Sequence, residues 1–433
     1  MKIAFLNQPL GTMRLPVHGG SMETWTYQVA RRLAQSCDVI VYAKKGRFQK
    51  KVEYDQGVHY RRISTAADEW STYISTAVDK LGRFPIFRNV RRLLFFRNVK
   101  RPLFASNLYY LTYVLQVAKD LRAEKCDVVH LHNFSQFVPI IRAFNPEIKI
   151  VLHMHCEWLT QLDRTMIERR LREADLVIGC SKYITEKIPH RFPQFAKCCQ
   201  TVYSGVDVNH FVSENNHWAT KKNGVKRLLF VGRNSPEKGL HVLLDAFKEV
   251  VGCYPQAQLK IVGSQGSLPI EFVVALSDDP KVRDLASFYS GNYTSHLQGK
   301  LSLGVGSHVS FTGFVSRQQL IDSYRDADVF VFPSVWNEPL GMPPIEAMAT
   351  EVPVVATRVG GITEIVEDGK TGILVEPGDA SALAEAILHL LSNEDLRKSM
   401  GEAARLRVVE LFSWEKIVEN LLRQYKNICP DND

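Results

Sequence analysis

Two acidic residues flank a proline-rich turn in the segment NEPLGMPPIEAMA, residues 337–349. Glu338 and Glu346 have seven residues between them, including Gly341 and two consecutive prolines. Proline is favoured in a first helical turn, so a helix should begin here. The free N–H groups of a helix start attract a phosphate. We therefore expect the two glutamates to accept hydrogen bonds from two sets of hydroxyls that flank one diphosphate. The alternative is that Glu346 is a first-turn acid favoured by the helix dipole.

Two cations precede this segment in RLLFVGRNSPEKGL, residues 227–240. The pattern predicts a strand that ends at Val231 and a helix that opens at Lys238. Ligands of open α/β sheets bind at the carboxyl ends of the strands, so Arg233 and Lys238 should reach into that crevice. A forked guanidinium and a flexible ammonium suit a diphosphate; the alternative is surface salt bridging. With the two glutamates, these cations fit a nucleotide-sugar.

The amino half of the chain has candidates of its own at the ends of predicted strands. HGGS, residues 18–21, places Gly19 and Gly20 in a turn between the first strand and a helix. His155 follows the run IKIVLHM and should stand at the carboxyl edge of the first sheet. The alternative for His155 is a structural histidine whose ring is satisfied by its neighbours.

A metal site is not expected. His153 and His155 have period-two spacing, but no carboxylate or cysteine constellation completes a set of ligands. His130 and His132, within VVHLH, should be buried strand residues. We therefore expect fixed cations to take the place of a divalent metal.

Short apolar runs alternate with helical patterns along the chain. Runs without polar alternation suit parallel strands that are covered on both faces, and strand–helix alternation predicts doubly wound α/β sheets. At 433 residues the chain should form two such domains. A polar linker, SENNHWATKKNGVKR, separates two series of predicted strands: KIAFLN, CDVIVYA, CDVVHLH, IKIVLHMH and ADLVIGCS in the first, and RLLFVGR, AQLKIVG, HVSFTGF, DVFVFPS, VPVVAT and GILVEP in the second.

Composition and charge limit the class of protein. The eight cysteines include no C-x-x-C, which favours reduced thiols and a cytoplasmic location. No apolar run approaches the roughly 18 residues that a membrane span needs. The net charge of +8 is uneven, and basic residues crowd between positions 83 and 101. This basic block predicts peripheral contact with an anionic membrane; the alternatives are a helix with a solvated basic face or a pocket for an anionic acceptor. It contains no nucleic-acid-binding module, so no nucleic-acid partner is expected.

An ordered series of motifs resembles one protein family over nearly the whole chain. GRNSPEKG, HVSFTGFV, ADVFVFPS, the E-x7-E pair, VPVVATRVGGITEIV and GILVEPGD resemble the second domain of the family-4 retaining glycosyltransferases of the group 1 type. HGGSMET, LHMH, CSKYITEKI and VYSGVDVNHF resemble first-domain and hinge motifs of the same family.

The resemblance implies a fold and an activity. The fold would be GT-B, with two Rossmann-like domains that face each other across a cleft. Residues 1–210 would form the acceptor domain, together with a returning C-terminal helix at 411–433, and residues 211–410 would form the donor domain. The protein would be a hexosyltransferase that needs no metal and retains the anomeric configuration. A UDP-sugar is the first expected donor and GDP-mannose the second; the acceptor would be a glycan, a lipid-linked molecule or a small molecule.

The resemblance also implies roles for single residues. Arg233 and Lys238 would bind the donor diphosphate, Glu338 would hold sugar hydroxyls and Glu346 the ribose. His155 would touch the transferred sugar near the reacting centre. The remaining donor-binding positions implied are Gly19, Gly20, Phe314, Leu340, Gly341 and Met342.

Three departures from the family pattern stand out. Glu351 takes the place of a usual glycine, Cys156 separates His155 from an acid, and the segment 264–309 exceeds the usual length. Two other kinds of protein stay open: a non-catalytic nucleotide-sugar-binding partner, or a sugar-nucleotide epimerase or phosphorylase of similar fold.

Overall fold

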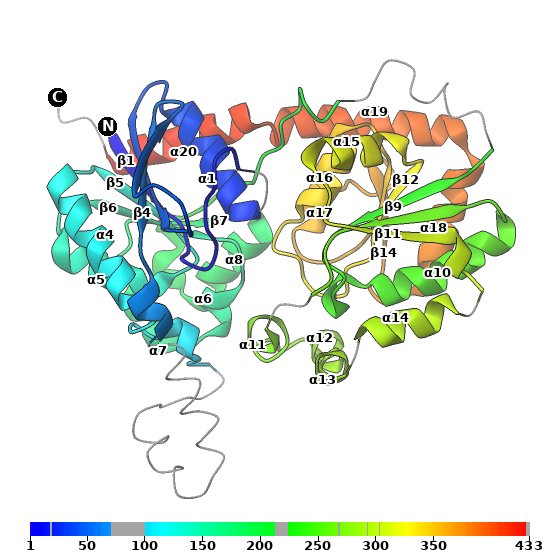
Figure 1. Ribbon diagram of the computed structural model, residues 1–433, viewed down its shortest axis with the longest axis horizontal. Coiled ribbons are helices and arrows are strands. Elements are labelled where there is room, and N and C mark those ends of the chain that lie inside the picture. Colours follow the sequence, from blue (N-terminus) through cyan, green and yellow to red (C-terminus); the bar gives the residue numbers. More distant parts are fainter. Residues whose placement is uncertain are drawn as a thin grey trace, which may run out of the picture. The chain divides into compact units, whose positions relative to one another are not determined.

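The computed structural model describes residues 1–17, 20–70, 100–212, 224–266, 269–291, 293–302 and 304–429. The chain divides into two compact units, each an α/β domain (Figure 1). One unit comprises Met1–Val202 with Ile417–Asp433, and the other comprises Tyr203–Lys416. From the sequence, the first domain was expected to end at residue 210 and to resume at residue 411. In the structure the first unit ends at residue 202 and resumes at residue 417.

The first unit is built on a sheet of eight strands in the order β3-β4-β2-β1-β5-β6-β7-β8. The neighbours pair in parallel, except that the edge strand β3 is antiparallel to β4. The order reverses between β1 and β5, and in such sheets the carboxyl ends at the reversal mark a ligand crevice. The strands are β1 (Lys2–Leu6), β2 (Asp38–Lys44), β3 (Val52–Asp55), β4 (Val58–Ile63), β5 (Val128–His132), β6 (Lys149–Met154), β7 (Leu176–Gly179) and β8 (Cys199–Thr201).

Helices cover the central strands of this sheet, which explains why those strands are apolar throughout. In β5 and β6, for example, Val129 and Ile150 are fully buried. The helices described are α1 (Ser21–Leu33), α4 (Leu111–Glu124), α5 (Val138–Phe144), α6 (Trp158–Gln161), α7 (Arg164–Leu171) and α8 (Lys182–Arg191).

The last helix of the described residues, α20 (Trp414–Ile428), belongs to the first unit from Ile417 onward. Ile417, Leu421 and Tyr425 recur every fourth residue and are buried. The hydroxyl of Tyr425 lies 2.8 Å from Nδ1 of His130 on β5. Asn420, on the same helix, also donates a 3.3 Å hydrogen bond to the carbonyl oxygen of Thr201.

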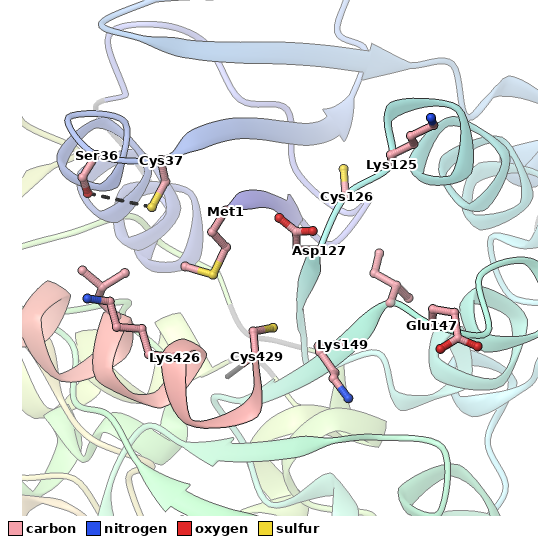
Figure 2. A pocket seen from close by; sticks show the side chains of 12 residues that line it. Met1, Ser36, Cys37, Lys125, Cys126, Asp127, Glu147, Lys149, Lys426 and Cys429 are labelled. Carbon is pink, nitrogen blue, oxygen red and sulfur yellow. Dashed lines mark hydrogen bonds between the residues drawn. The ribbon is translucent and has the colours of Figure 1, made fainter. Parts of the chain in front are cut away.

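A hollow of about 910 Å³ opens at the amino ends of β1, β5 and β6 (Figure 2). Its lining includes Met1, Cys37, Asp127, Lys149 and Lys426. Because ligands of doubly wound sheets bind at the carboxyl ends of the strands, this hollow lies at the wrong edge to serve as the expected crevice.

The second unit contains a six-stranded parallel sheet in the order β11-β10-β9-β12-β13-β14. This order reverses between β9 and β12, so the two strand ends that the sequence singled out flank the reversal. The strands are β9 (Arg227–Val231), β10 (Gln258–Val262), β11 (Val309–Gly313), β12 (Val329–Phe332), β13 (Val354–Thr357) and β14 (Gly372–Val375).

Helices lie on both faces of the second sheet. In Figure 1, α10 (Leu240–Cys253) and α18 (Ala380–Ser392) lie together on one side, and α15 (Arg317–Asp326) and α16 (Met342–Ala349) lie on the other. The sequence did not predict α19 (Glu394–Leu411), which packs against α16, or the short α17 (Ile362–Ile365).

The long segment between β10 and β11 contains extra helices. They are α11 (Ile270–Val273), α12 (Pro280–Asp284), α13 (Ala286–Ser290) and α14 (Tyr293–Leu301). Val282, Tyr293 and Leu297 are buried in the same apolar cluster as helix α10. The insertion is therefore part of the packed unit.

Glu351 follows α16 with a φ of 61°, in the left-handed region that favours glycine. Its carboxylate lies 3.7 Å from Nε of Arg405. The glutamate that replaces the family's usual glycine thus lies at the end of a helix, as expected.

Across the described part of the chain, no helix combines the length and apolar character required to cross a membrane. The basic block 83–101 was expected to contact a membrane. Its residues 83–99 lie outside the described residues. At its end, Arg101 forms an ion pair of 2.9 Å with Asp163.

Candidate functional site

The turn after β9 brings Lys238 to the end of β12. Gly239, the residue between Lys238 and helix α10, has a φ of 71°. A Cβ atom at this position would lie 1.8 Å from the carbonyl oxygen of Pro333, which follows β12. Only glycine permits both the left-handed backbone and this close approach. The glycine therefore allows the two loops at the reversal of the sheet to touch.

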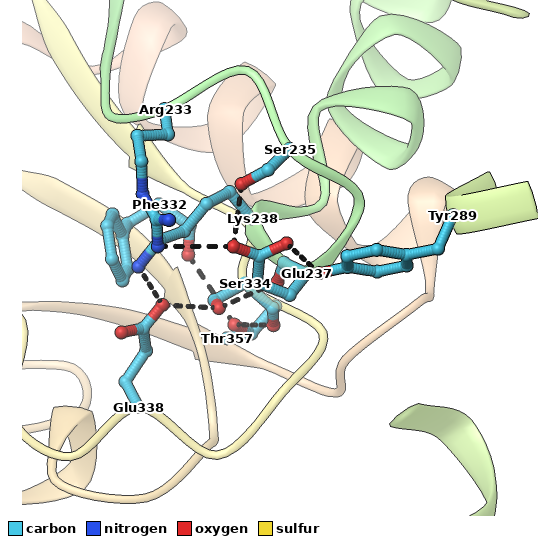
Figure 3. Close-up of polar contacts among 9 residues, drawn as sticks. All are labelled: Arg233, Ser235, Glu237, Lys238, Tyr289, Phe332, Ser334, Glu338 and Thr357. Atoms are coloured by element: carbon cyan, nitrogen blue, oxygen red, sulfur yellow. Dashed lines mark hydrogen bonds and ion pairs between the residues drawn. The ribbon is translucent and has the colours of Figure 1, made fainter. Parts of the chain in front are cut away.

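Lys238 and Glu338 form a direct ion pair (Figure 3). Nζ of Lys238 lies 2.6 Å from Oε1 of Glu338, and this oxygen also accepts a 2.7 Å hydrogen bond from the hydroxyl of Ser334. Glu338 is only 3% exposed. Its second oxygen, Oε2, has no hydrogen-bond partner among the described residues. A ligand hydroxyl could donate to that oxygen.

The aromatic rings of Phe332 and Trp336 flank the ammonium of Lys238, with ring centres 5.6 and 5.7 Å from Nζ. Such faces attract a cation and limit its movement. The ammonium is thus held in place before any ligand binds.

Arg233 lies on the same turn and contacts a different acid. One of its terminal nitrogens is 3.3 Å from Oε1 of Glu237, a fully buried residue, and the Arg233 side chain is 33% exposed. The hydroxyls of Ser235 and Tyr289 also donate to the Glu237 carboxylate, at 2.7 and 2.9 Å. The other guanidinium N–H groups of Arg233 have no described partner, so they are available to an anionic ligand.

Helix α16 begins after a glycine, at the loop that carries Glu338. Gly341 is the residue before the helix and has a φ of 104°, and a Cβ atom there would lie 2.5 Å from the side chain of Ile362. Leu340 is buried and Met342 is partly buried. The loop is closed by a 2.8 Å hydrogen bond from the Gly361 N–H to the carbonyl oxygen of Glu338. Because Pro343 and Pro344 have no N–H, Met342 is the one residue among the first three of α16 with a backbone N–H to offer.

Glu346 projects from the middle of α16 and has its own partner. Its Oε2 accepts a 2.8 Å hydrogen bond from the hydroxyl of Tyr324. Burial raises the pKa of Glu346 to about 7, against the opposing effects of the Tyr324 hydroxyl and Arg317. The structure thus separates the two glutamates, Glu338 beside Lys238 and Glu346 beside Tyr324.

Phe314 directly follows β11 at the carboxyl edge of the second sheet, and its side chain is 75% exposed. An exposed aromatic ring in this position can offer a flat face to a ligand. The geometry is compatible with the donor-binding role that the resemblance implies.

In the first unit, His155 follows β6 at the carboxyl edge of that sheet. Its Nε2 lies 3.0 Å from Nδ1 of His132, and its backbone N–H donates a 2.6 Å hydrogen bond to Oδ1 of Asn133. Burial lowers the pKa of His155 to about 3, so the ring is neutral near pH 7. Gly20 precedes α1 with a φ of 79°; Gly19 lies outside the described residues.

A chain of hydrogen bonds defines which nitrogen of His155 carries the proton. The hydroxyl of Thr26 donates to Oδ1 of Asn7 at 2.6 Å, and the amide nitrogen of Asn7 faces the Met13 sulfur at 3.5 Å. The Thr26 oxygen, 3.1 Å from Nε2 of His132, must then accept from that nitrogen. Nδ1 of His132 is left as an acceptor, so His155 donates from Nε2 and keeps an unprotonated Nδ1.

Three buried histidines, His130, His132 and His153, place ring nitrogens within 4.8 Å of one another. Nitrogens on His130 contact Tyr425 and His153, and those on His132 contact Thr26 and His155. These nitrogens are occupied by hydrogen bonds, which fits the expectation that His130 and His132 are buried strand residues.

Several residues of the site escaped prediction from sequence. Glu237, Tyr289 and Ser334 connect the two cations to the rest of the second unit, and Thr26 and His132 orient His155. Only Glu237 had a local signal, its place between Arg233 and Lys238. The other partners come from distant parts of the chain.

Two family models match successive parts of the chain. Residues 19–210 match the model for Glycosyltransferase Family 4, and residues 212–407 match the model for Glycosyl transferases group 1. Lipopolysaccharide 1,2-N-acetylglucosaminetransferase of Salmonella typhimurium is 26% identical over 98% of both chains.

Solved structures are similar over the same length. Sucrose-phosphate synthase from Thermosynechococcus elongatus has a TM-score of 0.71 at 23% identity, covering 99% of both chains. The Anabaena protein HepE in complex with UDP and glucose has a TM-score of 0.67 at 20% identity, covering 98% of both chains. The fold is therefore that of the GT-B glycosyltransferases. Because the two family models together extend from residue 19 to residue 407, the chain belongs to the glycosyltransferases of family 4, group 1.

Proposed function

We propose that this chain is a retaining, metal-independent hexosyltransferase that moves a sugar from a nucleotide-sugar to a glycan, lipid-linked or small-molecule acceptor. The proposed donor is a UDP-sugar, with GDP-mannose as the second choice. The main support is the 2.6 Å contact between Lys238 and Glu338 at the strand-order reversal of the second sheet. HepE, a protein of similar fold, has been solved with UDP, which supports the choice of base.

The proposed site works by stabilising charge. As the bond between the anomeric carbon and the diphosphate oxygen breaks, negative charge builds on the leaving diphosphate. Arg233, Lys238 and the backbone N–H of Met342 are held in place beforehand, so they need little reorganisation to receive that charge. The α16 dipole adds a partial positive charge at the same end.

The proposed reaction needs no side-chain nucleophile. The acceptor oxygen bonds to the anomeric carbon on the face from which the diphosphate departs, and the acceptor proton passes to a leaving phosphate oxygen. In this scheme Oε2 of Glu338 accepts from a sugar hydroxyl and Glu346 accepts from the ribose. Glu338 lies in the loop between β12 and α16, and Glu346 lies in the middle of α16 beside Tyr324.

Calorimetric titration of the purified chain with UDP and with GDP tests the donor. UDP should bind more tightly, and binding of neither nucleotide would overturn the donor assignment. Proton NMR of UDP-glucose hydrolysis without acceptor tests the stereochemistry. The α-anomer of glucose should appear first; initial release of the β-anomer would overturn retention. Nucleotide binding without turnover of any nucleotide-sugar would instead identify a binding protein.

A further inference from the structure

The insertion between β10 and β11 reaches the proposed diphosphate site through one side chain. Tyr289, on α13, places its hydroxyl 2.9 Å from Oε2 of Glu237 (Figure 3). Glu237 is the fully buried acid that contacts Arg233. The insertion therefore contacts Glu237, which in turn contacts Arg233, a proposed phosphate-binding cation.

The two oxygens of Glu237 have different partners. Oε1 accepts from the hydroxyl of Ser235 at 2.7 Å and lies 3.3 Å from the guanidinium of Arg233. Oε2 accepts from Tyr289. A buried carboxylate is costly unless its oxygens are hydrogen-bonded. Without the Tyr289 hydroxyl, Oε2 of Glu237 would lose its hydrogen bond, and the carboxylate would turn toward the Arg233 guanidinium that contacts Oε1.

Packing holds α13 in place on the other side. The hydroxyl of Tyr293, which begins α14, lies 3.2 Å from the backbone nitrogen and 3.0 Å from Nδ1 of His241 on α10. The ring of Phe288 lies 5.1 Å from the ring of His241. Burial and the Glu237 carboxylate raise the pKa of Tyr289, so its hydroxyl remains a donor near neutral pH.

We infer that Tyr289 is a positioning residue: acting through Glu237, the insertion sets the orientation of the Arg233 guanidinium for the donor diphosphate. This inference rests on the proposed function. Phosphate recognition by arginine depends on the direction of its planar fork, so a small rotation of the guanidinium weakens binding without unfolding the loop.

The substitution Tyr289→Phe removes the hydroxyl and keeps the ring. Calorimetric titration with UDP should show binding weaker by about tenfold, the effect of one hydrogen bond to a charged group. Tyr293→Phe is a matched control, because it removes the same group from a neighbouring helix that contacts His241 and not Glu237. It should leave UDP affinity unchanged. Thermal unfolding of each variant, measured before titration, confirms that folded protein is compared.

A double-mutant cycle separates positioning from a general structural effect. Arg233→Ala alone should weaken UDP binding strongly, and adding Tyr289→Phe should cause little further loss, because the hydroxyl acts through the missing guanidinium. Additive losses would overturn the inference. The inference would also be overturned if Tyr289→Phe bound UDP as the wild type does while Arg233→Ala bound it weakly. That result would leave the proposed function intact. Unchanged binding in Arg233→Ala would overturn the diphosphate assignment and the inference together.

Discussion

The ammonium of Lys238 and the carboxylate of Glu338 lie 2.6 Å apart, although 100 residues separate them in the chain. Their contact joins the turn after β9 to the loop before α16. The carboxylate stays buried because it is paired, and the cation stays near the helix start because the carboxylate holds it. A diphosphate that binds here would meet a positive charge already in position.

Replacing Lys238 by alanine should lower transfer by roughly 10²–10³-fold, or about 3–4 kcal/mol of barrier, the typical cost of removing one preorganised donor. The measurement is the initial rate with a radiolabelled UDP-sugar once an acceptor is known, or the rate of donor hydrolysis before then. Lys398→Ala, at an exposed position on α19, is the control with the same loss of charge. Normal turnover in a folded Lys238→Ala protein would contradict the assignment.

Glu346 should make stability depend on pH. Burial raises its pKa to about 7 in the folded protein from an ordinary value of 4.5. Between these values the folded protein binds a proton more strongly than the unfolded chain, so its contribution to stability is full below about pH 4.5 and is lost as the pH rises through 7. Urea unfolding at several pH values should show this slope, and Glu346→Gln should flatten it.

The same group should release a proton when nucleotide binds, because ribose hydroxyls donate to the ionised carboxylate and favour that form. Titration with UDP near pH 6.5, in two buffers of different ionisation enthalpy, measures the protons released. Identical proton release by wild type and Glu346→Gln would exclude Glu346 as its source.

The ring of His155 should be neutral, with its proton on Nε2, throughout the range from about pH 5 to 8, because burial lowers its pKa to about 3. Long-range ¹H–¹⁵N spectra distinguish the protonated ring nitrogen from the bare one, and loss of signals in His155→Gln identifies them. Thr26→Val removes the hydroxyl that orients His132 and should mix the two tautomers. Thr26→Ser keeps the hydroxyl and should preserve the wild-type pattern; a mixed pattern in wild type would refute the proposed hydrogen-bond chain.

Removal of divalent metal should leave turnover unchanged, since Arg233 and Lys238 supply the positive charge that a metal would otherwise provide. Donor hydrolysis after dialysis against EDTA, compared with the same sample after addition of magnesium or manganese, checks this. Strict dependence on added manganese would refute the metal-free scheme.

Gly239→Ala should destabilise the second unit by at least about 1–2 kcal/mol, the penalty for a left-handed residue with a Cβ atom. Contact with the Pro333 carbonyl oxygen adds to this cost. Gly252→Ala is the matched control, because that position lies in α10 and has open space around it. It should stabilise the unit by about 0.5–1 kcal/mol. Urea unfolding of both variants measures the difference, and equal stabilities would contradict the proposed close contact.

The central parallel strands of both sheets and most of the helices after them could be predicted from sequence, because a strand covered on both faces is apolar at every position. The edge strand β3 and its neighbour β4 were missed for the opposite reason. In VEYD and VHYRRI, polar and apolar side chains alternate, and several face solvent. Helix α19 was missed because its sequence is mostly polar and only a narrow stripe, including Met400, Ala404 and Val408, is buried.

Arg233, Lys238 and Glu338 could be found because strand ends, glycine turns and charged residues lie close together in the sequence. Their supporting partners could not. Tyr289 lies 52 residues from Glu237, and Thr26 lies 106 residues from His132. Such pairs depend on the three-dimensional packing of separate elements, and no local pattern indicates them.

Helix α20 supplies Ile417, Leu421 and Tyr425 to the interior of the first unit, although the whole second unit lies between them and residue 202 in the chain. A ribosome adds residues one after another, so residues 1–202 emerge long before residue 417 is translated. During that interval β5 lacks the hydroxyl that meets His130 and the apolar cover beside it. The first unit therefore stays incompletely folded until residues 417–425 have been translated, and nascent chains at this stage are the ones that chaperones can bind.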